Sequence, residues 1–173
     1  MKDGFIKVAA VTPKIVVADT KENTRIICDA IKNAGKQGAK VVVLPELCIT
    51  GYTCSDLFLQ EKMLREAKEA LLEIAAATFS LDGIVFVGLP LEYNGKLYNV
   101  AAAISSGNVL GFVPKTFLPN YNEFYEVRHF TRGMDETVFV PLNQDVVVPM
   151  GRKLLFTCAS MPELKIGVEL CEE

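Results

Sequence analysis

Residues 40–46 read KVVVLPE, an apolar run that ends at a proline and a glutamate. A short run of this kind, rich in β-branched side chains, is typical of a buried strand. Two further apolar runs end in the same way, FVP at 112–114 before Lys115 and IGVEL at 166–170 before Cys171. Because open α/β sheets hold their ligands at the carboxyl ends of parallel strands, we expect Glu46, Lys115 and Cys171 to meet at one edge of a sheet.

Two amphipathic helices are predicted between the early strands. Asp19 is a candidate N-cap with Glu22 three residues later, as in a capping box, and Gly35 is a candidate helix end. Residues 55–56, Ser-Asp, are the candidate cap of a second helix whose apolar side chains recur through residues 63–74. Both helices are expected to cover one face of the sheet.

The remaining pattern is mostly strands. Asn94 and Gly95 form the dipeptide that favours a tight hairpin turn. Two helices on one face of a strand-rich sheet make a two-layer unit, and the other face should meet a second sheet. The expected strands cover residues 5–11, 40–44, 84–91, 97–105, 109–113, 138–140, 145–148, 154–157 and 164–170.

Composition narrows the class of protein. The 173 residues fit one domain, half of them are apolar, and the net charge is −3 without a cluster of Lys or Arg. These values disfavour nucleic acid and anionic membranes as partners. No apolar stretch approaches the roughly 20 residues of a membrane helix, and the stretch at 5–11 is too short for a signal peptide. Five scattered cysteines are consistent with reduced thiols in a cytoplasmic protein.

A carboxylate, an ammonium and a thiol together can attack an amide. A free thiol has a pKa of about 8.5 and is mostly protonated at neutral pH, so a base must take its proton. We expect Glu46 to be that base, and Lys115 to favour the thiolate of Cys171 and face the developing oxyanion. The backbone N–H of Glu172 is a second candidate donor. The expected course is a thioester, release of ammonia, and hydrolysis.

Simpler interpretations exist for each residue. Considered one at a time, Glu46 could be a solvated carboxylate, Lys115 a surface charge, and Cys171 a small buried side chain. His129, the only histidine, could pair with Cys171 or join Cys48 and Cys54 at a metal. The cysteine spacing does not favour zinc. The long polar and aromatic segment 115–135 has too few cations for a nucleic-acid platform, and as a long loop it is expected to carry function.

Three motifs give these residues a context. LPEL at 44–47, KTFLP at 115–119 and GVELCE at 167–172 resemble the glutamate, lysine and cysteine motifs of the nitrilase superfamily of carbon-nitrogen hydrolases, in the same chain order. Within it, residues 44–52 and 115–126 are similar to the glutaminase domains of glutamine-dependent NAD synthetases. The resemblance covers the whole chain.

The resemblance implies an α/β fold, a nitrilase-like αββα sandwich, incomplete at the C-terminus because the chain ends just after the nucleophile. Residues 1–173 would form one glutaminase domain, with Glu46 as base, Lys115 as oxyanion stabiliser and Cys171 as nucleophile. It also implies substrate-binding residues: two tyrosines lining the glutamine pocket, a glutamate that positions Lys115 or the substrate amine, and two further side chains. They are, in that order, Tyr52, Tyr121, Glu123, Phe124 and Glu126.

The same resemblance implies partners. Glutamine is the expected substrate, and the ammonia would amidate deamido-NAD in a separate synthetase domain. No cofactor or metal is expected in this domain, whereas ATP and Mg belong to the synthetase domain, which is absent from this sequence. A homo-oligomer is expected. The alternatives are a stand-alone amidase or nitrilase acting on another compound, and an inactive fragment that only associates.

Overall fold

The computed structural model describes residues 4–172. Two long helices and two short 3-10 helices accompany nine strands. In chain order they are β1 (Lys7–Ala10), α1 (Thr20–Lys36), β2 (Ala39–Val43), η1 (Ser55–Leu59), α2 (Glu61–Ala77), β3 (Ile84–Tyr93), β4 (Lys96–Ser105), β5 (Asn108–Pro114), η2 (Glu126–Arg128), β6 (Val138–Pro141), β7 (Val147–Met150), β8 (Phe156–Cys158) and β9 (Met161–Ile166).

Seven of the strands form one mixed sheet in the order β1-β2-β3-β4-β5-β7-β6. The strands β1, β2 and β3 are parallel, and two antiparallel hairpins then lead from β3 through β4 to β5. Because the chain reverses twice, β5 runs in the same direction as β2. The residues that follow these two strands therefore reach the same edge of the sheet, as the sequence predicts for Glu46 and Lys115.

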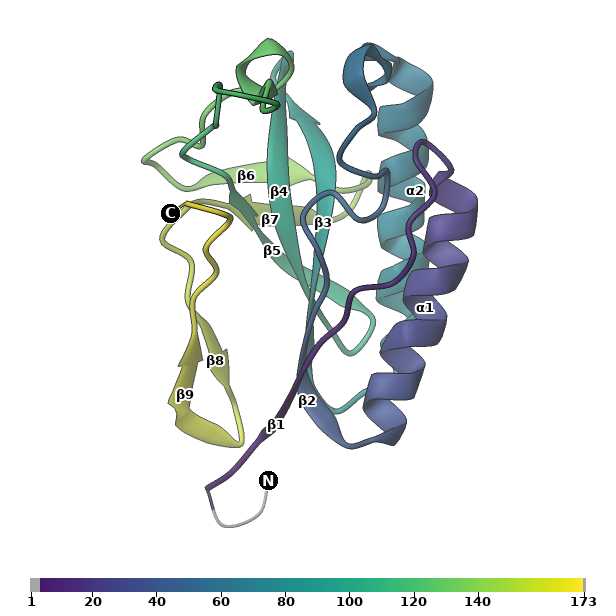
Figure 1. The fold of residues 1–173 in the computed structure, drawn as a ribbon. Coiled ribbons are helices and arrows are strands. Elements are labelled where there is room, and N and C mark those ends of the chain that lie inside the picture. The colour runs from purple at the N-terminus through teal and green to yellow at the C-terminus, as the bar shows by residue number, and fades with distance from the viewer. Residues whose placement is uncertain (1–3, 173) are drawn as a thin grey trace.

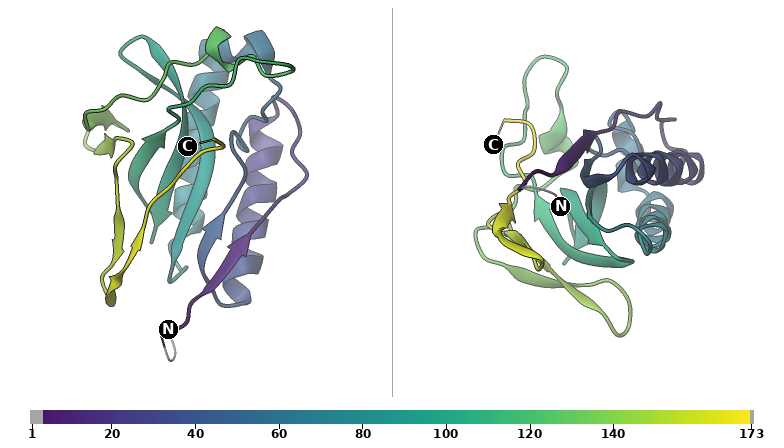
Figure 2. Two further views of the ribbon diagram at one scale, coloured as in Figure 1. Left: turned by 60° about the vertical axis from the view of Figure 1, so that its left-hand side comes forward. Right: turned by 90° about the horizontal axis from the view of Figure 1, so that it is seen from below.

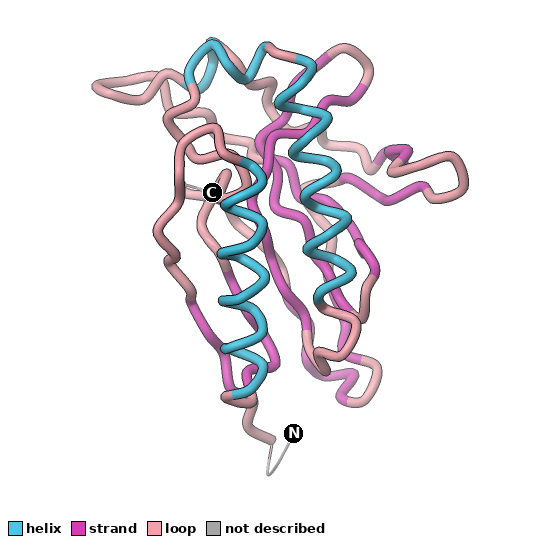
Figure 3. The backbone as a smooth tube through the Cα atoms, turned by 90° about the vertical axis from the view of Figure 1, so that its right-hand side faces the viewer, coloured by secondary structure: helices cyan, strands magenta, loops and turns pink. Residues whose placement is uncertain are grey.

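The molecule is layered. Helices α1 and α2 lie side by side against one face of the sheet, and the β8–β9 hairpin lies on the opposite side (Figures 1 and 2). Seen from the helical side, both helices run along the strands (Figure 3). The predicted α/β class is confirmed. None of the helices in the described part of the chain is long and apolar enough to cross a membrane.

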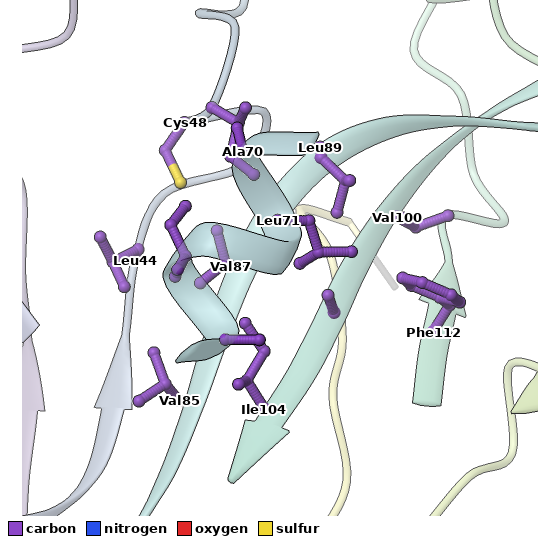
Figure 4. Close-up of a cluster of buried hydrophobic side chains, with 14 of the residues drawn as sticks. Leu44, Cys48, Ala70, Leu71, Val85, Val87, Leu89, Val100, Ile104 and Phe112 are labelled. Atoms are coloured by element: carbon purple, nitrogen blue, oxygen red, sulfur yellow. The ribbon is translucent and has the colours of Figure 1, made fainter. Parts of the chain in front are cut away.

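The main core lies between the helices and the sheet. Leu71 of α2 contacts the face of the sheet formed by alternate residues of β3 and β4 (Figure 4). Period-two alternation explains the choice of residues, because every second side chain of a strand points to the same face. The labelled side chains of this cluster are Leu44, Cys48, Ala70, Leu71, Val85, Val87, Leu89, Val100, Ile104 and Phe112.

The structure corrects two helix boundaries. Asp19 is the N-cap of α1, and its carboxylate accepts a hydrogen bond from the Glu22 amide at 3.0 Å, as predicted. The helix does not end at Gly35, since it continues to Lys36, and Gly38, at φ +82°, makes the left-handed turn. Residues 55–56 do not cap α2, because they belong to η1 and α2 begins only after Gln60.

The last predicted strand is also corrected. Strand β9 ends at Ile166 instead of reaching Leu170, and it pairs with β8 in a separate two-stranded sheet. The hairpin packs across the open face of the main sheet, where the rings of Phe156 and Phe86 lie 5.8 Å apart. Cys171 therefore approaches the sheet edge from a crossing segment and not from a third parallel strand.

Candidate active site

Glu46 lies in the turn that follows β2, and a glycine in β3 makes room for that turn. A Cβ atom on Gly88 would lie 2.3 Å from the Leu47 amide nitrogen and 2.7 Å from the Pro45 carbonyl oxygen. Leu47 itself has φ +51°, so the chain bends sharply just after Glu46. The absence of a side chain at Gly88 thus fixes the place of the carboxylate.

Lys115 follows β5 and is held on both sides by main-chain hydrogen bonds. Its amide donates to the Asn99 carbonyl at 2.8 Å, and its own carbonyl accepts from the Gly133 amide at 2.8 Å. Its side chain has 0% exposure, and the ammonium donates to Glu46 Oε1 at 2.7 Å and to Glu126 Oε1 at 2.6 Å. A buried ammonium is thereby shared by two carboxylates.

The electrostatic balance at Lys115 favours the charged form. Burial lowers the pKa of the ammonium, but the hydrogen bonds to Glu126 and Glu46 and the charges of both carboxylates outweigh it, so that the net shift is upward. This is the arrangement that a buried cation requires, because a charge taken out of water is tolerated only with opposite partners. Lys115 is therefore a fixed positive charge at neutral pH.

Glu126 is the second carboxylate beside Lys115, whereas the resemblance implies that Glu123 positions Lys115 or the substrate amine. The Glu126 side chain is 4% exposed and also accepts a hydrogen bond from the Tyr52 hydroxyl at 2.5 Å. Burial first, and then the bond to Glu126, raise the pKa of the Tyr52 phenol. Glu123 is exposed and lines a neighbouring cavity of about 220 Å³ together with Tyr52 and Glu126. In this geometry Glu123 lies beside that cavity and makes no described contact with Lys115.

Cys171 is exposed and has a left-handed backbone, with φ +62°. Such conformations are strained for non-glycine residues and gather at functional sites. The segment 168–171 lines a hollow of about 150 Å³ that Glu46 also lines. Leu170 anchors the segment, because its buried side chain packs with Ala101 and Val113 on the sheet face. Glu46 and Cys171 therefore line one small hollow.

Aromatic side chains form a cluster that reaches the residue next to Cys171. The Phe124 ring lies edge-on to Tyr121, with centroids 5.6 Å apart, and to Tyr52, with centroids 6.4 Å apart. The Tyr121 hydroxyl donates to the carboxylate of Glu172, next to Cys171, and this bond is the main cause of the raised pKa of Tyr121. Of the predicted substrate-binding residues, Tyr52, Tyr121, Phe124 and Glu126 lie together in this cluster.

Two residues of the site escape sequence reasoning. The side-chain amide of Asn99 donates a hydrogen bond to Glu46 Oε1, the oxygen that Lys115 also contacts. The signal for Asn99 is an amide inside the otherwise apolar strand LYNVAAAI at 97–104. The signal for Gly88 is a glycine in the middle of a strand, which marks a close approach of backbone.

The contacts of His129, Cys48 and Cys54 do not support a His129–Cys171 pair or a metal site at these three residues. The His129 ring contacts Asp56 Oδ1 at 3.2 Å. Cys48 is buried, and burial raises the pKa of its thiol to about 12. Cys54 is buried as well, with its sulfur at 3.1 Å from the Thr50 carbonyl oxygen. Within residues 4–172, no group of three His, Cys, Asp or Glu side chains is placed to hold a metal ion.

The arrangement combines the parts that amide cleavage by a thiol requires. The exposed Cys171 and Glu46 line one hollow, and the Lys115 ammonium bonds both Glu46 and a second carboxylate, Glu126. A thiol residue, two carboxylates and a positive charge are thus concentrated at one edge of the sheet, which are the groups that nucleophilic and general-base catalysis use.

Comparisons with known proteins agree with this chemistry. The family described as carbon-nitrogen hydrolase matches residues 7–173. The glutamine-dependent NAD(+) synthetase of Mycobacterium leprae is 36% identical over 170 residues, which are 98% of this chain and 25% of that protein. The chain thus spans about a quarter of the length of that relative.

Two solved structures share the fold. The crystal structure of a glutamine-dependent NAD(+) synthetase from Cytophaga hutchinsonii superposes with a TM-score of 0.89 at 36% identity, covering 97% of this chain and 28% of that one. An amidase from Nesterenkonia sp. superposes with a TM-score of 0.63 at 24% identity, covering 79% of this chain and 51% of the amidase. The second likeness shows the fold alone.

Proposed function

Because this chain belongs to the carbon-nitrogen hydrolase family, we propose that it hydrolyses the side-chain amide of glutamine, with Cys171 as nucleophile. The observation that carries the proposal is the shared Lys115 ammonium, which bonds both Glu46 and Glu126 beside the hollow that Glu46 and Cys171 line. Similarity to glutamine-dependent NAD(+) synthetases supports glutamine as the substrate.

The proposed reaction begins with proton transfer. Glu46 takes the proton from the Cys171 thiol, and the sulfur adds to the amide carbon to give a tetrahedral oxyanion. The charge of Lys115 stabilises the anionic species at this edge of the sheet. Glu46 then returns the proton to the leaving nitrogen, ammonia departs, and a thioester remains. A water that Glu46 activates hydrolyses the thioester and releases glutamate.

The ammonia has a proposed use in a longer protein that contains this chain. There it would amidate deamido-NAD in a synthetase domain that binds ATP and Mg. This step would need no cofactor in the described domain. The name of the Mycobacterium leprae relative supports the coupling between glutamine and NAD synthesis.

The proposal is tested by incubating the chain with glutamine or with propionamide as a second substrate, and measuring the release of glutamate or of propionate. Cys171→Ala should abolish hydrolysis, whereas Cys158→Ala, which removes a half-buried thiol in the β8 strand, should leave it intact. Mass spectrometry after exposure to a glutamine-like diazoketone should find the label on Cys171. Equal loss in both variants, or labelling elsewhere, would refute the role of Cys171. Turnover of propionamide but not of glutamine would favour the stand-alone amidase.

The chain is also proposed to self-associate. Apolar side chains are exposed on both edge strands of the sheet, with Val8 in β1 at 63% and Phe139 in β6 at 63%. Edge strands with exposed apolar side chains favour association. Sedimentation velocity should find oligomers, and a clean monomer that hydrolyses glutamine would exclude this part of the proposal and the purely associating fragment.

A further inference from the structure

We propose that Asn99 is a positioning residue for the general base: its side-chain amide and the Lys115 ammonium together occupy Oε1 of Glu46, so that Oε2 is the oxygen that takes the thiol proton. This inference rests on the proposed function, because it concerns the proton transfer from Cys171. Asn99 touches no reacting atom and would act only through Glu46.

The hydrogen bonds of the Glu46 carboxylate are one-sided. Within residues 4–172, Glu46 accepts from the Asn99 amide and from the Lys115 ammonium, and both donors bond to Oε1. The Glu46 side chain is 21% exposed and lines the same hollow as segment 168–171, and no described donor bonds its other oxygen, Oε2. Two donors fixed on one oxygen prevent rotation of the carboxylate and leave the lone pairs of the other oxygen for a proton.

Asn99 also fixes the second donor. Its main-chain carbonyl accepts the hydrogen bond from the Lys115 amide at 2.8 Å, which extends the β4–β5 pairing by one residue beyond Val100 and Pro114. The side chain of Asn99 therefore holds Glu46, and its main chain holds Lys115. A single residue of β4 thus contacts both the carboxylate and the strand end that carries the ammonium.

Packing alone does not explain why an asparagine occupies position 99. Ala101 and Ala103 occupy the next two positions on the same face of β4, and both are buried. Asn99 is 1% exposed, and its Oδ1 is buried and has no hydrogen-bond partner among the described residues. An unpartnered buried oxygen is unfavourable. An apolar residue would avoid this penalty, so the donor to Glu46 is what the amide provides.

Kinetic variants test the proposal. Asn99→Ala should lower kcat for glutamine hydrolysis about 10- to 100-fold, a part of the usual contribution of a general base, with KM changed less than about threefold. Asn99→Asp keeps the shape of the side chain but removes the amide donor, and it should lower kcat at least as much as Asn99→Ala does, again with little change in KM. Asn108→Ala is the control, because Asn108 is exposed and donates only to the Ser106 carbonyl.

A ¹⁵N–¹H spectrum gives a readout that does not depend on turnover. The side-chain amide signals of Asn99 should move in Glu46→Gln, which replaces the carboxylate that accepts from this amide, and should stay in place in Asn108→Ala. Asn99 signals that are unchanged in Glu46→Gln, or Asn99→Asp with the wild-type kcat and KM, would overturn the inference while leaving glutamine hydrolysis in place. If the wild-type chain releases no glutamate although the Asn99 signals respond to Glu46→Gln, the proposed function fails and the positioning contact stands.

Discussion

Replacement of Lys115 by methionine removes a charge from the centre of the site and keeps most of the side-chain volume. The ammonium has 0% exposure and bonds two carboxylates, of which Glu126 is 4% exposed. Removing one partner from a buried ion pair destabilises a protein by about 3–5 kcal/mol, because the remaining charge is left without compensation. We expect Lys115→Met to lower the unfolding free energy by this amount at pH 7.

Urea denaturation followed by circular dichroism measures this loss. With a slope of about 2 kcal/mol per molar urea, the midpoint should fall by about 2 M. Lys40→Met is the matched control, since Lys40 pairs with Asp82, whose side chain is 93% exposed, and screened pairs of this kind contribute little. A Lys115→Met midpoint close to that of Lys40→Met would refute the account of a buried, shared ammonium.

The same charge predicts a dependence on alkaline pH. The pKa of Lys115 is raised in the folded state, against an unfolded value of about 10.4. The folded chain therefore binds this proton more tightly, and the stabilisation is complete below about pH 10 and is lost as the pH rises through the folded pKa. Wild-type stability should decline above about pH 10 by a component that Lys115→Met lacks.

Two further substitutions test the supports of the site. Gly88→Ala would place a Cβ atom 2.3 Å from the Leu47 amide nitrogen, so the turn that carries Glu46 must move. We expect thermal unfolding to show a loss of about 1–3 kcal/mol of stability, together with reduced hydrolysis. Gly167→Ala is the control, because its Cβ atom would meet only Leu155, at 3.6 Å, and it should change neither stability nor hydrolysis. Tyr52→Phe removes the 2.5 Å hydrogen bond to Glu126 and should lower the unfolding free energy by about 1 kcal/mol, and an unchanged urea midpoint would contradict this.

Much of the fold can be predicted from sequence periodicity, because neighbouring residues determine the local geometry of caps, turns and strands. The capping pair Asp19 and Glu22, the Asn94-Gly95 turn and the strands β2 to β5 depend on neighbouring residues, and they appear close to where they are predicted. The ends of elements depend on distant contacts. Asp56 shows this, because its carboxylate bonds Arg128, 72 residues away, instead of capping α2.

Distant contacts also decide which of two neighbouring glutamates is buried. Glu123 and Glu126 are three residues apart in one loop, and nothing local distinguishes them. The short helix η2 begins at Glu126 and turns its side chain inward, where Lys115 and the Tyr52 hydroxyl meet it, while Glu123 remains exposed. Only the folded loop decides which carboxylate is buried.

A sequence motif marks the residues that react, whereas their spacing is set by residues that have no reactive group. The carboxylate is placed by the missing side chain of Gly88, and the ammonium by main-chain bonds to Asn99 and Gly133. These supports belong to β3, β4 and the loop after η2, far from the motifs in sequence. Because each acts through a close approach or a main-chain contact, its function is defined only once the strands are paired. A site assembled at the edge of a sheet therefore shows its chemistry in the sequence and its geometry in the structure.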